Sequence, residues 1–124
     1  MPAMNSHIIV LSAVLMLLQA GCVTQQQISY QRDVVPIIEN KCLPCHIPPD
    51  GTGYLRSQLN MNSYELIMEG NVYGPVIVPG DSRHSILNML VEGRIDISVR
   101  TPHPLTAMEI KTLRLWVDQG AMNN

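Results

Sequence analysis

The run Cys42-Leu43-Pro44-Cys45-His46 brings two thiols and an imidazole together in one short stretch of sequence. Two residues between the cysteines suit two thiols that add across the two vinyl groups of a porphyrin, and Cys-x-x-Cys-His is the attachment pattern of c-type haem. On a helical turn, the histidine next to the second cysteine presents its ring to the iron. The pattern therefore predicts one covalently attached haem c, with His46 as the proximal axial ligand of the iron. The far ring nitrogen of His46 is expected to donate to a backbone carbonyl.

A cysteine pair with this spacing could also bind zinc or act as a redox pair. Cys42 and Cys45 could form half of a zinc site that is completed by His46, His84 or His103, but structural zinc sites usually show a second close-spaced ligand pair. The sequence contains no such pair. A thioredoxin-like redox pair would need a βαβ setting, and the sequence downstream is not rich in strands. Haem is the favoured interpretation, and a zinc-binding module is kept as an alternative.

The N-terminal segment has the features of an export signal. Residues 8–18 form an apolar run that is about as long as a signal-peptide core and shorter than the roughly 20 residues that span a bilayer. The run ends in Leu-Gln-Ala-Gly before Cys22, which resembles the lipobox of bacterial lipoproteins. We expect a signal peptide over residues 1–21, and the resemblance implies acylation of Cys22 and a lipid anchor in a membrane. Cleavage by ordinary signal peptidase is the alternative, and a buried helix with an inert Cys22 thiol is another.

Export places the protein in the periplasm or on the cell surface, where haem of this type is attached. Residues 22–29 are read as a polar tether and residues 30–124 as one small domain. The chain is 46% hydrophobic but only 4% aromatic, with no phenylalanine, so a buried macrocycle would supply apolar bulk that the core lacks. The net charge is -2 and no basic stripe is present, so we expect no nucleic-acid partner.

The domain is predicted to be all-α with long loops. Ser29 can cap a segment whose apolar residues recur at helical spacing, and we expect a helix from about Pro36 into the motif. Residues 47–53, which follow the motif, are too rich in proline and glycine for anything but a loop.

The middle of the chain predicts a short helix and an irregular segment. Asn62 or Ser63 can cap a helix that runs through Glu69 and is closed by Gly70. The apolar run 74–80 is bounded by prolines and glycines, so it is too short for a helix and unsuited to a central strand.

Two more helices are predicted near the C-terminus. Asp81 or Ser82 opens the first, which ends at Gly93 and has an apolar face formed by Ile86, Met89 and Leu90. The second stops at Gly120; it begins with a capping box of Thr106 and Glu109, and its apolar stripe consists of Ile110, Leu113, Trp116 and Val117.

Residues 30–121 resemble a single-haem class I cytochrome c domain of the planctomycete-type branch. The resemblance rests on Asp-Val-Val-Pro-Ile at 33–37, on Gly-Pro-Val-Ile-Val-Pro-Gly-Asp at 74–81, and on Pro-Leu-Thr at 104–106 with Leu-Trp-Val-Asp-Gln-Gly-Ala at 115–121. It implies the cytochrome c fold, with the terminal helices packed together and the haem in a cleft. It also implies electron transfer to redox protein partners that dock at an exposed haem edge.

The distal side of the iron departs from this family. A Met-Pro pair normally precedes the last helix and its methionine is the sixth ligand, whereas this chain has Thr101 and Pro102. His103, two residues on, is a candidate distal axial ligand and would give a bis-histidine iron of lower potential. An open or water-filled site and a methionine are the alternatives. An open site would make the protein a sensor of small gaseous ligands or a weak peroxidase, although no general acid or base pattern supports an enzyme.

Overall fold

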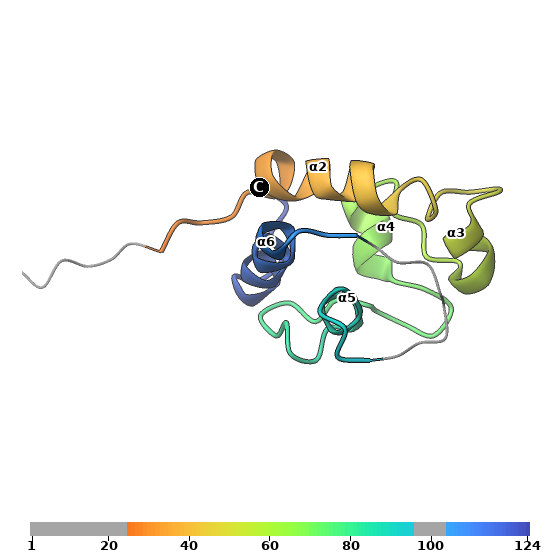
Figure 1. Cartoon of the computed structure of the whole chain (residues 1–124). Coiled ribbons are helices and arrows are strands. Elements are labelled where there is room, and N and C mark those ends of the chain that lie inside the picture. Colours follow the sequence, from red (N-terminus) through yellow and green to blue (C-terminus); the bar gives the residue numbers. More distant parts are fainter. Residues whose placement is uncertain (1–24, 96–103) are drawn as a thin grey trace, which may run out of the picture.

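The computed structural model describes residues 25–95 and 104–124. In these two stretches helices alternate with loops, and the only β pairing is an isolated bridge between Asn71 and Gly74. The predicted all-α class is therefore confirmed for this part of the chain. None of the helices described is long and apolar enough to cross a membrane. The elements are η1 (Tyr30–Val34), α2 (Val35–Ile37), η2 (Ile38–Cys42), α3 (Thr52–Ser57), α4 (Tyr64–Glu69), α5 (Ile86–Val91) and α6 (Ala107–Asp118) (Figure 1).

The first helix, formed by η1, α2 and η2, begins earlier than the sequence predicts. Ser29 is its N-cap, because its hydroxyl accepts a hydrogen bond from the backbone of Arg32 at 3.2 Å, and the helix starts at Tyr30 rather than near Pro36. Pro36 has no N–H and its ring crowds the carbonyl one turn earlier. The preceding turn is accordingly wide: the N–H of Val35 donates to the carbonyl of Tyr30, five residues back. The predicted cap is confirmed, and the predicted start is wrong.

The middle segment follows its prediction closely. The Ser63 hydroxyl accepts from the backbone of Leu66 at 3.3 Å and caps α4, which ends at Gly70 with a φ of 90°. A side chain at Gly70 would also collide with the backbone of Gly74. The run 74–80 is neither helix nor strand, as predicted.

Helix α5 is shorter than predicted and turns a different face to the core. The Asp81 carboxylate accepts hydrogen bonds from the backbones of Arg83 and His84, at 3.1 and 3.2 Å, and holds a turn where the sequence predicts helix. The helix starts only at Ile86. Its buried residues are Leu87 and Asn88, whereas two residues of the predicted apolar face, Ile86 and Leu90, are exposed.

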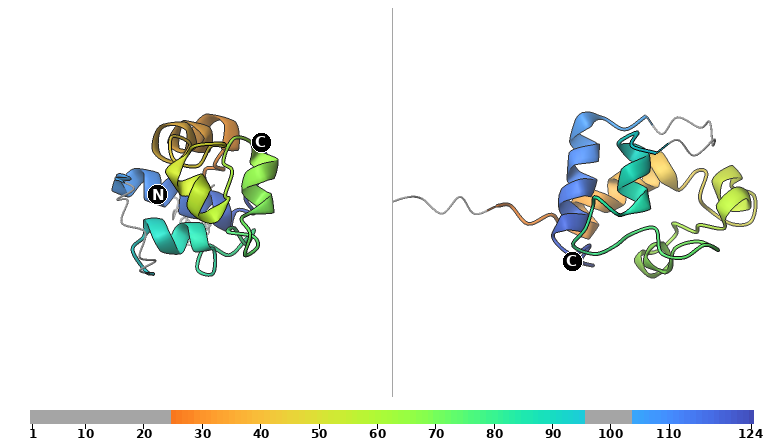
Figure 2. Two further views of the ribbon diagram at one scale, coloured as in Figure 1. Left: turned by 90° about the vertical axis from the view of Figure 1, so that its right-hand side faces the viewer. Right: turned by 90° about the horizontal axis from the view of Figure 1, so that it is seen from below.

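Helix α6 confirms the clearest prediction. Thr106 and Glu109 form the capping box, with the Thr106 backbone donating to the Glu109 carboxylate at 2.6 Å. Three of the four stripe residues, Leu113, Trp116 and Val117, are fully buried. The helix crosses η1 and lies beside α5 (Figures 1 and 2). Helix α6 therefore packs against both the first helix and α5.

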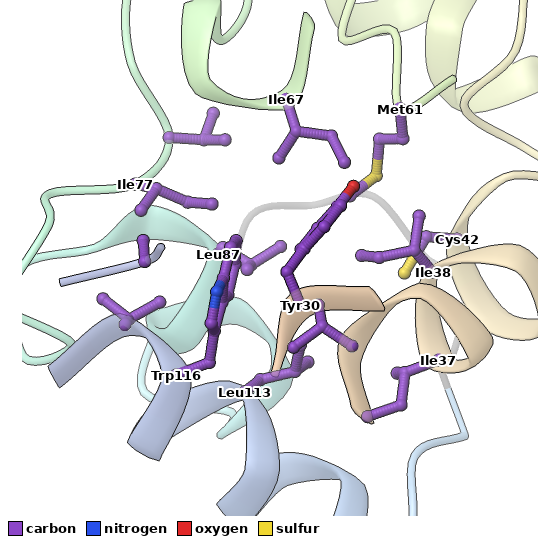
Figure 3. Packing of buried hydrophobic residues seen from close by; sticks show 14 of the residues in the cluster. Tyr30, Ile37, Ile38, Cys42, Met61, Ile67, Ile77, Leu87, Leu113 and Trp116 are labelled. Carbon is purple, nitrogen blue, oxygen red and sulfur yellow. The ribbon is translucent and has the colours of Figure 1, made fainter. Parts of the chain in front are cut away.

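Aromatic rings stack at the centre of this junction. The rings of Tyr30 and Trp116 lie 5.4 Å apart, and Tyr64 meets Tyr30 edge-on at 5.1 Å. The polar groups of Tyr64 and Trp116 are both hydrogen-bonded. The Tyr64 hydroxyl donates to the carbonyl of Ala121, and the Trp116 ring N–H donates to the carbonyl of Met122. Figure 3 shows Tyr30 and Trp116 side by side among the aliphatic side chains of the core.

The segment that leads into the first helix is fastened to the residues that follow α6. The side-chain oxygen of Gln119 accepts from the backbone of Ile28 at 2.7 Å, and its amide nitrogen donates to Gln26 at 3.1 Å. Asn124 accepts from the backbone of Tyr30 at 2.9 Å and donates to the carbonyl of Ile28 at 3.3 Å. We call these four hydrogen bonds the terminal clasp.

Candidate functional site

The first helix continues past η2 for one more turn and carries the motif on it. The backbone N–H groups of Cys45 and His46 donate to the carbonyl of Cys42, at 3.1 and 3.0 Å. The two cysteines and the histidine are thus presented from a single turn, as the spacing predicts. Both thiols are free.

The two cysteines have different surroundings. Cys42 is 3% exposed and its sulfur lies beside Ile38 in the buried cluster (Figure 3), whereas Cys45 is partly exposed. Burial raises the pKa of the Cys42 thiol to about 11, with smaller contributions from Glu109 and Cys45. Cys42 is therefore a protonated thiol at neutral pH in this structure.

The ring of His46 is oriented by a backbone carbonyl. Its Nδ1 lies 3.3 Å from the carbonyl oxygen of Leu59, and because a carbonyl can only accept, Nδ1 is the nitrogen that carries the proton. In the neutral ring the basic lone pair then belongs to Nε2, the tautomer that suits a metal ligand. The carbonyl expected from the sequence is thus provided by Leu59. The backbone of Met61 donates to the carbonyl of His46 at 2.9 Å and holds the same segment in place.

Two glycines allow the chain after the motif to fold back on it. A Cβ at Gly51 would lie 2.5 Å from the carbonyl oxygens of Cys45 and Ile47, and a Cβ at Gly53 would lie 2.7 Å from Cε1 and Nε2 of the His46 ring. Both distances are shorter than side chains tolerate, so only glycine fits at these two positions.

This close approach also explains a wrong prediction. Residues 47–51 are a loop as expected, but Thr52 and Gly53 belong to α3. The backbone of Tyr54 donates to the carbonyl of Cys45 at 2.9 Å, which anchors the helix on the motif. In the sequence these glycines indicate a loop, but in the structure they allow close packing against the motif. No local sequence pattern distinguishes a glycine of a loop from a glycine at such a contact.

The other ligand candidates are separated from the motif or lie outside the described residues. His84 is on the exposed turn before α5, where its Nδ1 lies 2.6 Å from the Asp81 carboxylate. Within residues 25–95 and 104–124, no three His, Cys, Asp or Glu side chains come together as a metal-binding group. Cys22, Thr101 and His103, and the signal peptide predicted over residues 1–21, are outside the range that the structure describes.

One buried polar side chain was not singled out by the sequence. Asn88 on α5 is 0% exposed, and neither the oxygen nor the nitrogen of its side-chain amide has a hydrogen-bond partner. It is the one residue of the described chain with this property.

A hollow of about 380 Å³ lies between the first helix and the segment that leads into α4. Its lining includes Leu43 and Met61 but neither the cysteines nor His46, so it is separate from the three groups of the motif.

No protein-family model, no curated protein and no solved structure matches the chain. The residues and geometry of this chain therefore carry its functional assignment.

Proposed function

We propose that the protein is an exported c-type cytochrome that carries one haem on Cys42, Cys45 and His46 and transfers electrons. The single observation that carries the proposal is the presentation of these three groups from one helical turn, with Nδ1 of His46 directed at the carbonyl of Leu59. That contact leaves Nε2 as the basic nitrogen of the ring. A structural cysteine pair would have no need for a histidine held in this tautomer.

The surroundings of the motif fit a haem. Thiols and an imidazole are the donor set that c-type attachment requires. Glycine at position 53 lets the backbone pass close to the Cε1–Nε2 edge of the His46 ring without a side chain that would clash with it. Cys42 points into an aliphatic core, where an apolar macrocycle gains from burial.

Each residue of the motif has a distinct part in this function. Cys42 and Cys45 would hold the haem covalently through their two sulfur atoms. His46 would be the residue that holds the iron, and the Leu59 carbonyl orients the ring and raises its basicity as a ligand. When bound, the haem supplies an iron that alternates between two oxidation states.

Spectroscopy of the full chain tests the proposal. The protein is produced in a host that has haem-maturation machinery, and its absorption is recorded before and after denaturation. We expect haem to stay with the denatured chain, and to be lost from the double variant Cys42→Ala/Cys45→Ala. Each single variant should keep one thioether and show a shifted spectrum of the reduced haem. A wild-type chain that loses all its haem on denaturation would refute covalent attachment.

The second candidate function is a ligand-binding haem protein, which is favoured by Thr101 at the usual methionine position. The same preparation distinguishes it from an electron carrier. Carbon monoxide binds a reduced haem readily only where the sixth position is open. If His103 is the distal ligand, the wild type resists carbon monoxide and His103→Ala binds it. Rapid binding by the wild type would favour the sensor over the carrier.

We further propose that the chain is exported and lipidated at Cys22. Mass spectrometry of the mature protein tests both steps. The expected N-terminus is an acylated Cys22, and Cys22→Ser should move the protein from the membrane fraction to the soluble periplasmic fraction. A mature chain that still carries residues 1–21 would contradict export by a signal peptide.

A further inference from the structure

The hollow between the first helix and the segment that leads into α4 has a volume of about 380 Å³, a size that small-molecule ligands occupy. Part of its lining is apolar, with Val35 and Leu43 on one side and Met61 on the other. The lining also includes two carboxylates, those of Glu39 and Glu65. The hollow therefore combines an apolar surface with negative charge.

The protein does not balance this charge. Among the described residues that line the hollow, none is lysine, arginine or histidine. Neither Glu39 nor Glu65 takes part in an ion pair of the described chain. An anionic ligand would be repelled here, whereas a cation would gain from both carboxylates.

The hydroxyl of Tyr30 is a second feature that points to a ligand. Tyr30 is 5% exposed and lines the hollow, and within the described residues its hydroxyl has no hydrogen-bond partner. Figure 3 shows this hydroxyl at the end of the ring that points toward Met61, which lines the hollow as well. A hydroxyl in such a place costs free energy when it has no partner, and phenylalanine would fill the same space without this cost. A ligand in the hollow would supply the missing hydrogen bond.

The hydroxyl and the two carboxylates interact with one another. Burial raises the pKa of Tyr30, and the charges of Glu65, Tyr64 and Glu39 raise it further. The hydroxyl is therefore neutral at pH 7, and its oxygen can accept hydrogen bonds. An ammonium group has three N–H donors and one positive charge, so it matches a neutral oxygen beside two carboxylates. A divalent metal ion fits less well, because no three His, Cys, Asp or Glu side chains come together in the described residues.

We propose that this hollow binds a small primary alkylammonium ion, with the ammonium group at Tyr30 and the carboxylates and the alkyl chain against the apolar lining. The Tyr30 oxygen accepts an N–H hydrogen bond, which is strong because the donor is charged. Glu39 and Glu65 attract the cation, and the side chains of Val35 and Leu43 cover methylene groups that water would otherwise surround. The site is independent of the haem function, because its lining contains none of the three groups of the motif.

Isothermal titration calorimetry of the purified protein at pH 7 tests the site, with n-butylammonium chloride as the probe. We expect saturable binding of one ion per chain. Two compounds of similar size each lack one feature of the probe: n-butanol has no charge, and tetramethylammonium chloride has no N–H donor. Each should bind at least about tenfold more weakly than n-butylammonium.

Two variants locate the bound ion. Tyr30→Phe removes the hydroxyl but keeps the ring beside Trp116, so it should be at least as stable as the wild type and bind n-butylammonium about tenfold more weakly. Glu65→Gln should weaken binding about two- to fivefold, because its carboxylate is exposed to solvent. Glu69→Gln, on the same helix but outside the lining, is the matched control and should keep the wild-type affinity.

Four results would overturn the proposal. Absence of saturable binding would refute the site directly. If n-butanol binds as tightly as n-butylammonium, the charge of the hollow plays no part. If calcium chloride displaces n-butylammonium at equal concentration, the carboxylates form a metal site. Wild-type affinity in both Tyr30→Phe and Glu65→Gln would place the ion elsewhere, and Glu65→Gln compared with Glu69→Gln decides alone if Tyr30→Phe does not accumulate.

Discussion

At the scale of single residues, the two cysteines of the motif differ in reactivity. Cys42 is buried with a pKa of about 11, so roughly one molecule in ten thousand carries its thiolate at pH 7, and the thiolate is the reactive form. In the haem-free chain we expect iodoacetamide to modify Cys45 well before Cys42. Peptide mass spectrometry after timed quenching measures both rates, and equal rates in urea provide the control. Equal rates without urea would contradict the burial of Cys42.

Gly53 is the second residue with a direct effect on the site. A methyl group there would meet the His46 ring at 2.7 Å, so Gly53→Ala should tilt or displace the ring that we propose as the proximal ligand. We expect a changed spectrum of the oxidised haem and faster binding of carbon monoxide. Thr52→Ala, at the exposed neighbouring position, is the control and should leave both unchanged. An unaltered spectrum in Gly53→Ala would show that the ring has room to move.

The motif itself could be predicted from the sequence because all its chemistry lies in consecutive residues. The rest of the site could not, because its members meet only in three dimensions. The Leu59 carbonyl belongs to a residue that carries no chemical signal, and it reaches His46 only after α3 has folded back on the motif.

At the scale of elements, local signals decided which helices were predicted well. Helices α4 and α6 begin after Ser63 and Thr106, whose side chains accept hydrogen bonds from backbone N–H groups of the first turn. Both starts agree with those predicted from the sequence. The boundary of α3 depends on its contact with the motif, whereas the predictions for the first helix and α5 failed because nearby residues form turns that their types do not indicate. Pro36 widens a turn instead of starting the helix, and Asp81 holds a turn of its own.

The capping box of α6 makes a measurable contribution to stability. Thr106→Ala removes the oxygen that accepts from the backbone of Glu109 at 3.2 Å. The free energy of unfolding should fall by about 1 kcal/mol. Urea denaturation measures the loss, and Lys111→Ala on the exposed face of the same helix is the control. A loss equal to that of the control would show that the box does not stabilise the helix.

An ion cluster joins the end of α5 to α6 and should make stability depend on pH. Burial raises the pKa of Glu92, but hydrogen bonds from Arg114 and Arg94 outweigh it and leave that pKa below its ordinary value. The folded state therefore binds this proton less readily than the unfolded chain, and the stabilisation present at neutral pH is lost as the pH falls through the carboxyl range.

The variant Glu92→Gln tests this dependence. Its unfolding temperature should be lower than that of the wild type at pH 7, and the difference should shrink towards pH 3. Glu69→Gln, at an exposed position of α4, is the matched control and should follow the wild type at every pH. A constant difference between Glu92→Gln and wild type across this range would contradict the cluster's role.

At the scale of the whole molecule, one core holds the helices together. Leu113 of α6 is 0% exposed and lies among the residues around Tyr30 and Trp116 (Figure 3). Leu113→Ala should lower the free energy of unfolding by about 2–5 kcal/mol. Leu55→Ala, at a position that is 65% exposed, should change it by less than about 0.5 kcal/mol. Similar effects of the two variants would refute a shared core.

The terminal clasp has a mechanical consequence. Its hydrogen bonds tie the backbone at Gln26 and Ile28 to Gln119, and that at Ile28 and Tyr30 to Asn124. A force applied to the chain ahead of residue 26 is therefore transmitted to the end of α6 before it can unwind the first helix. The motif at the far end of that helix is therefore shielded from tension on the segment that precedes the helix.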